Sequence, residues 1–97
     1  MRLIGIDYGQ KRVGIAVSDE EIIGKKFEDE KSSLFVSEGF YKGEQVNEEE
    51  ARNLLVNAKN INAVGEESVK LCVKLGLIKE ENILIIGGIK HAQIISA

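Results

Sequence analysis

Asp7 is the first residue in the chain whose type and position could do chemistry. It closes the apolar run RLIGID and precedes Tyr8 and Gly9, so its carboxylate would stand at the end of a short strand. A carboxylate placed there can hold a divalent metal ion if further carboxylates come close to it, and Glu66 and Glu67 are the candidates. The alternative, which we favour, is that Asp7 caps a turn before a β-hairpin, while Glu66 and Glu67 stabilise the positive end of a helix.

A second group of chemically capable residues lies in the stretch GGIKHAQ, which contains Gly87, Gly88, Lys90, His91 and Gln93. We expect the two glycines to form a hairpin turn that another backbone can approach closely. Alternation along the following strand places His91 and Gln93 on one face. We predict that this segment is a binding surface; a structural histidine bonded to a neighbouring carbonyl is the alternative. Acid–base catalysis has little support, because no nucleophile lies near His91 in the sequence.

The stretch NINAVGEES offers a third candidate, an anion site at a strand-to-helix turn. Asn62 and Gly65 would lie at this turn, where free backbone amides can hold a phosphate. Glu66 and Glu67 would occupy the same amides and repel an anion, so simple helix capping is the preferred interpretation.

Composition limits the classes of function. The chain has 97 residues, which we interpret as one domain, with 43% hydrophobic and 30% charged residues. Thirteen Lys and Arg stand against sixteen Asp and Glu, so a net charge of −3 disfavours strong unaided binding to nucleic acid, although a local contact stays open. No apolar run of about 18 residues occurs, so no membrane span is expected. The single cysteine, Cys72, is expected to be a small core residue in a reducing cytoplasm.

The first third of the chain predicts a hairpin followed by a short helical segment. Residues 2–7 and 13–19 are apolar runs on either side of YGQKR, which is typical of a β-hairpin. Ser18 followed three residues later by Glu21 resembles a capping pattern, and Gly24 would end one or two helical turns.

The middle of the chain predicts less regular structure. Residues 32–38 predict a third strand, and residues 39–45 predict a loop punctuated by glycine. Phe40 and Tyr41 in this loop would either face a partner or fold back onto the domain.

Two helices and a final pair of strands complete the predicted elements. Asn47 can cap the amide of Glu50 at the start of a helix whose buried stripe would include Leu54 and Leu55. A short strand, INAV, precedes a second helix that starts after Gly65. The run NILIIGGIKHAQIIS predicts two strands around the glycine pair. Because strands and helices do not alternate strictly, we predict an α+β fold: one small domain with an N-terminal hairpin, a mixed sheet, two main helices and a C-terminal strand pair.

Two resemblances bear on function. The opening GIDYGQKRVGIAVSD resembles the first hairpin of the YqgF/RuvX-like family, which has a ribonuclease H-like fold and includes Holliday-junction resolvases and enzymes that process ribosomal RNA precursors. This resemblance implies a metal-dependent nuclease in which Asp7 binds magnesium or manganese.

The second resemblance covers more of the chain. The blocks SDEEIIGKKF, VSEGFYKGEQVNEEEARNLL and NINAVGEESVKLCVKLGLIKEENILIIGGIKHAQI, within residues 18–95, resemble the archaeal domain of unknown function 424 family. It implies a fold without an established activity. We therefore expect a cytoplasmic binding module without enzymatic activity or a cofactor, acting on a protein or ribonucleoprotein partner, with the nuclease as the alternative.

Overall fold

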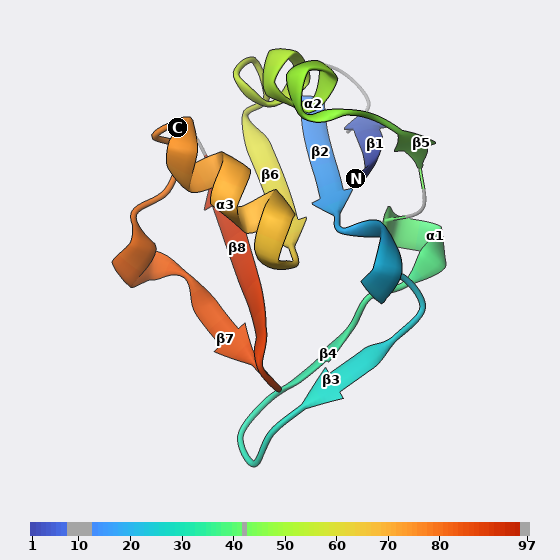
Figure 1. Ribbon diagram of the computed structural model, residues 1–97, viewed down its shortest axis with the longest axis vertical. Helices are drawn as coiled ribbons and strands as arrows, with labels where there is room; N and C mark the ends of the chain where they lie inside the picture. Colours follow the sequence, from blue (N-terminus) through green and yellow to red (C-terminus); the bar gives the residue numbers. More distant parts are fainter. Residues whose placement is uncertain (8–12, 42, 96–97) are drawn as a thin grey trace.

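The computed structural model describes residues 1–7, 13–41 and 43–95, and within the first two strands it describes the backbone but not the side chains of residues 3–7 and 13. The chain forms a six-stranded mixed sheet and a separate two-stranded hairpin (Figure 1). The order in the large sheet is β5-β1-β2-β6-β8-β7. Its strands are β1 (Arg2–Asp7), β2 (Val13–Ser18), β5 (Glu44–Gln45), β6 (Asn60–Val64), β7 (Leu84–Ile86) and β8 (Ile89–Ile95).

Strand directions make the sheet mixed. The β2 and β6 strands are parallel, and every other neighbouring pair of the sheet is antiparallel. A parallel pair needs a long crossover, and the connection from β2 to β6 contains the small hairpin of β3 (Lys26–Glu28) and β4 (Ser33–Phe35). The α+β single domain predicted from the sequence is confirmed.

The helices lie mainly on one face of the sheet (Figure 1). The helix α3 (Glu66–Lys74) crosses in front of β6 and β8, and α2 (Glu48–Leu55) lies at one end of the strands. The short helix α1 (Glu38–Tyr41) and two 3₁₀ turns, η1 (Glu20–Ile22) and η2 (Glu80–Asn82), complete the fold. Among the described residues, no helix combines the length and apolar character needed to cross a membrane.

Alternation along the central strands divides the interior into two clusters. Ile15, Val17, Ile61 and Ala63 point toward the helices, where they pack with residues of α2 and α3 such as Leu55, Val69, Leu71 and Cys72. Ala16 and Val64 point the other way and pack with Ile22, Val36 and Tyr41. Burial raises the pKa of the Cys72 thiol to about 11, so Cys72 is the inert core residue that its sequence context predicts.

The hairpin, both main helices and the terminal strand pair are confirmed, but several local predictions are wrong. Ser18 does not start a helical turn; it ends β2, and its hydroxyl donates to the Asp19 carbonyl. Residues 39–45 are not merely a loop, because they contain most of α1 and all of β5. The strand β3 was not expected. Leu54 is 46% exposed, so the buried stripe of α2 consists of Ala51 and Leu55.

Candidate functional site

The face of the sheet opposite α3 carries a row of apolar and polar side chains along β7 and β8, most of them exposed and one, His91, half-buried. In the register of these strands, His91 pairs with Leu84 on one side and with Val64 on the other. Gln93 and Ile95 follow at alternate positions, so they share the face of His91 as the sequence predicts. We call Leu84, His91, Gln93 and Ile95 the β8 platform. Leu84 is 59% and Ile95 69% exposed, which leaves two large aliphatic side chains beside two polar ones.

His91 is tied into the fold by a hydrogen-bond network. Its Nε2 lies 2.8 Å from Oδ1 of Asn62, and the same oxygen accepts from the Tyr41 hydroxyl at 3.0 Å. Because that oxygen only accepts, Nε2 carries the proton and donates, and Nδ1 is left as a buried acceptor without a partner among the described residues. Burial lowers the pKa of His91, and it raises the pKa of Tyr41 to about 12. A neutral histidine bonded to a side-chain carbonyl matches the structural alternative given above.

Lys90 is separated from the other polar residues of its segment. It alternates to the helix side of the sheet, where its ammonium lies 3.2 Å from the Glu66 carboxylate. Gln93 is exposed. The segment GGIKHAQ therefore contributes to two surfaces rather than one.

The glycine pair forms the turn predicted between β7 and β8, with φ of 56° at Gly87 and 83° at Gly88. Two consecutive positive φ values are typical of the two-residue hairpin turn. The backbone that approaches Gly87 belongs to the same chain, at Glu28 and Asp29. The Gly87 N–H donates to Asp29 Oδ2 at 3.1 Å, and a Cβ added at Gly87 would lie 2.6 Å from the Glu28 nitrogen. The hydrogen bond from Gly87, followed by those from Lys31 and Ser32, lowers the pKa of Asp29.

The amides at the start of α3 are occupied by a carboxylate from a distant part of the chain. Asp19 accepts hydrogen bonds from the Glu67 N–H at 2.9 Å and from the Ser68 N–H and hydroxyl at 2.8 Å each. Asp19 is buried, at 4% exposure. Gly65 precedes the helix with φ of 105°, and a Cβ there would clash with the Asp19 Cγ. The position considered for a bound anion thus holds an internal one, and Asn62 lies apart from it on β6.

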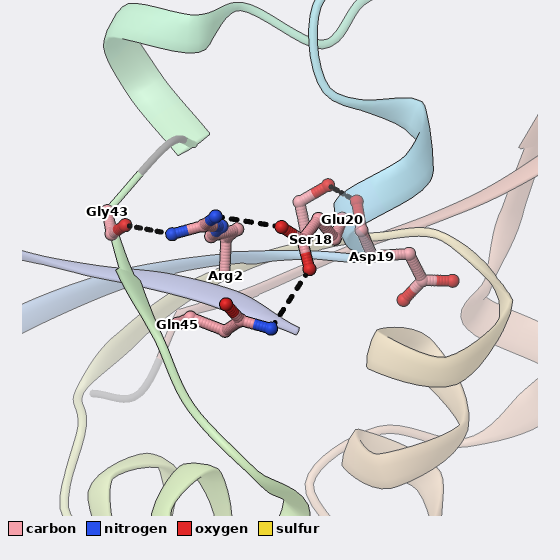
Figure 2. Close-up of polar contacts among 6 residues, drawn as sticks. All are labelled: Arg2, Ser18, Asp19, Glu20, Gly43 and Gln45. Atoms are coloured by element: carbon pink, nitrogen blue, oxygen red, sulfur yellow. Dashed lines mark hydrogen bonds and ion pairs between the residues drawn. The ribbon is translucent and has the colours of Figure 1, made fainter.

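Glu20, next to Asp19, makes a different set of contacts (Figure 2). Its carboxylate lies 2.7 Å from the Arg2 guanidinium and accepts from the Gln45 side chain at 3.1 Å. Arg2 also donates to the Gly43 carbonyl at 3.5 Å. These contacts join η1 to β1 and β5, and the Asp19 carboxylate points away from them (Figure 2).

The backbone places Asp7 far from its proposed carboxylate partners. Its side chain lies outside the described residues, but its backbone ends β1 opposite Val13. Ser18, at the other end of this strand pair, lies beside Val64, two residues before α3 begins. Five residue steps at roughly 3.4 Å each separate the two ends by about 17 Å. The structure therefore does not bring Asp7 together with Glu66 and Glu67, and it shows no cluster of three metal-binding side chains among the residues it describes.

Comparisons with known proteins agree with the fold and leave the function open. Residues 6–96 match a family described as "Protein of unknown function (DUF424)", so the match includes most of the opening hairpin as well as the blocks recognised within residues 18–95. The chain is also similar to a crystal structure of an uncharacterized conserved protein from Methanopyrus kandleri. The identity is 27%, the TM-score is 0.73, and the similarity covers 100% of this chain and 95% of the other. No functionally curated protein matches the chain.

Proposed function

We propose a binding function for this chain, which belongs to the DUF424 family of proteins of unknown function. The protein acts as a cytoplasmic module without enzymatic activity, and the β8 platform contacts a protein partner directly or within a ribonucleoprotein. The observation that carries this proposal is the exposure of Leu84 and Ile95 on the sheet face opposite α3. Apolar side chains that share one face of a sheet are more typical of an interaction surface than isolated ones, and the register places Leu84 and Ile95 on the same face.

The polar residues of the platform would fix the orientation of a bound partner. Gln93 lies between His91 and Ile95 on the same face and presents both donors and an acceptor. His91 is held in one orientation by Asn62, so its half-buried ring forms a fixed base beside Gln93. Fixed polar groups beside apolar ones give an interface its specificity.

Charge favours protein over nucleic acid as the group directly contacted. The platform consists of neutral residues, because the pKa of His91 is lowered by burial and Lys90 lies on the opposite face. Nucleic-acid affinity depends mainly on cations that neutralise phosphates, and the net charge of the chain is −3. A partner with a complementary apolar surface fits this face better than a phosphate backbone.

Site-specific photo-crosslinking in cell extract tests the proposal. A photoreactive amino acid in place of Gln93 should form a defined crosslink to a protein, and Ile95→Asp in the same chain should reduce its yield about tenfold or more. The matched control is Val56→Asp, which alters an aliphatic residue of comparable exposure, 52%, next to α2. Equal yields from the Ile95→Asp and Val56→Asp proteins, both folded by circular dichroism, would remove the platform as the contact surface.

A further inference from the structure

The strand β7 ends the sheet on one side, and its outer edge is strongly apolar. It consists of Leu84, Ile85 and Ile86, of which Leu84 is 59% and Ile85 63% exposed. The opposite edge strand, β5, is the polar pair Glu44–Gln45. Charged residues on an edge strand prevent sheets from pairing with other chains, and β7, although it is only three residues long, has no charged residue.

The hairpin geometry directs one set of backbone groups outward from this edge. Ile86 and Ile89 close the two-residue turn, and in such a hairpin the closing pair is hydrogen bonded. Hydrogen-bonded and non-hydrogen-bonded pairs alternate, so Ile85 and Lys90 form a pair of the second kind. The N–H and C=O of Ile85 therefore point away from β8.

A groove lies between this edge and α3. It has a volume of about 390 Å³. The apolar residues lining it are Val69, Val73, Ile83 and Ile85, and the charged ones are Glu66, Lys70, Glu80 and Lys90. Two positive and two negative side chains thus surround an apolar centre, and Lys90 and Glu66 already form an ion pair.

We propose that β7 is the interface of a homodimer, in which it pairs antiparallel with β7 of a second copy about a two-fold axis at Ile85. An outward N–H and C=O on one residue match the same residue of a second copy, because an antiparallel hydrogen-bonded pair exchanges both bonds. Leu84 then lies opposite Ile86 of the second copy, and the two Ile85 side chains meet beside their grooves.

Charge complementarity supports a second copy as the occupant. Besides the Lys90–Glu66 ion pair, the groove carries one Lys and one Glu, Lys70 and Glu80, so two copies bring together charges that sum to zero, whereas a charged peptide would leave one sign uncompensated. The dimer does not depend on the binding function proposed above. It would place the two β8 platforms side by side on one continuous sheet face.

Sedimentation equilibrium, from micromolar to millimolar protein, measures the association. The wild-type chain should show a monomer–dimer equilibrium. Ile85→Lys should raise the dimer Kd by about tenfold or more, because each lysine would face its own copy. Val56→Lys, at a comparably exposed aliphatic position away from β7, should leave the Kd unchanged. A monomer at every concentration, or a dimer equally stable in the Ile85→Lys protein, would refute the proposal.

A cysteine crosslink tests the register and does not depend on the lysine variant. The Cα atoms of a hydrogen-bonded antiparallel pair lie about 5.5 Å apart, within the range that a disulfide spans. Ile85→Cys should therefore form a covalent dimer under mild oxidation, and Val56→Cys should not. The native Cys72 is buried with a raised pKa and stays unreactive. An Ile85→Cys chain that stays monomeric while its β7 amide resonances shift on addition of an unrelated extended apolar peptide would instead identify the edge as a site for a partner's strand.

Discussion

At the scale of single residues, Asp19 joins parts of the chain that are distant in sequence. Its carboxylate accepts three hydrogen bonds from Glu67 and Ser68, which lie 48 and 49 positions later. A charged acceptor at the first turn of a helix satisfies amides that have no partner within the helix and interacts favourably with the helix dipole. Because Asp19 is buried, no water can replace these bonds without a rearrangement.

The Asp19 cap predicts a specific pattern of stability. Asp19→Ala should lower the free energy of unfolding by about 2 to 3 kcal/mol, since it leaves buried donors without an acceptor. Asp19→Asn keeps one acceptor and should cost less. Glu21→Ala, at an exposed acid of the adjacent turn, should stay within about 0.5 kcal/mol of wild type. Urea denaturation measures all three, and a loss for Glu21→Ala as large as that for Asp19→Ala would contradict the assignment of the cap.

Asp19 also shows why sequence reasoning fails at some residues and succeeds at others. Asn47 caps α2 within its own turn: its side chain accepts from the Glu50 amide at 2.8 Å, and the Glu50 carboxylate accepts from the Asn47 amide at 3.1 Å. Both partners lie within four residues, so the local sequence contains the whole motif. The cap of α3 comes from another element, and only the Gly65 that makes room for it is visible locally. The sequence does not predict the Asn62, Tyr41 and His91 network for the same reason, because its members come from three different elements.

At the scale of elements, the helix α2 shows that local sequence determines where a helix starts but not which of its residues are buried. The sequence predicts its start correctly, because the capping box is local, but it does not distinguish Leu54 from Leu55. Two adjacent leucines lie about 100° apart around a helix, and only the position of the sheet determines which one is covered. The structure buries Leu55 completely and leaves Leu54 46% exposed.

This difference gives α2 an ordered series of mutational effects. Leu55→Ala should cost about 2 to 5 kcal/mol, because it opens a cavity in the core shared with the sheet. Asn47→Ala should cost about 1 kcal/mol through the loss of the capping box. Leu54→Ala should cost less than about 1 kcal/mol, because its side chain already contacts water. Chemical denaturation of the three variants gives the order, and a Leu54→Ala protein less stable than Leu55→Ala would show that the helix is rotated from its place in the structure.

At the scale of the whole molecule, the two sheets meet at the β7–β8 turn. The Asp29 carboxylate, in the turn between β3 and β4, accepts from the Lys31 and Ser32 amides and from Gly87. The sequence predicts the Gly87–Gly88 turn but not the hairpin that packs on it, since this contact spans 58 residues. Among the described residues, this packing leaves Leu84, Ile85 and Ile95 exposed, so both proposed interaction surfaces are compatible with one fold.

Gly87→Ala tests the packing of the β3–β4 hairpin on the turn, and Gly88→Ala is its matched control. Both glycines have positive φ, so replacing either with alanine should cost about 1 to 2 kcal/mol in backbone strain. At Gly88 a Cβ would meet nothing within 4 Å, whereas at Gly87 it would lie 2.6 Å from the Glu28 nitrogen and 3.0 Å from the Glu28 oxygen. Backbone atoms cannot rotate away, so Gly87→Ala must displace the hairpin and should cost about 1 to 3 kcal/mol more than Gly88→Ala. Urea denaturation gives the difference, and in the Gly87→Ala protein the amides of β3 should also exchange hydrogen faster. Equal losses at the two positions, with unchanged exchange in β3, would mean that the hairpin does not pack on the turn in solution.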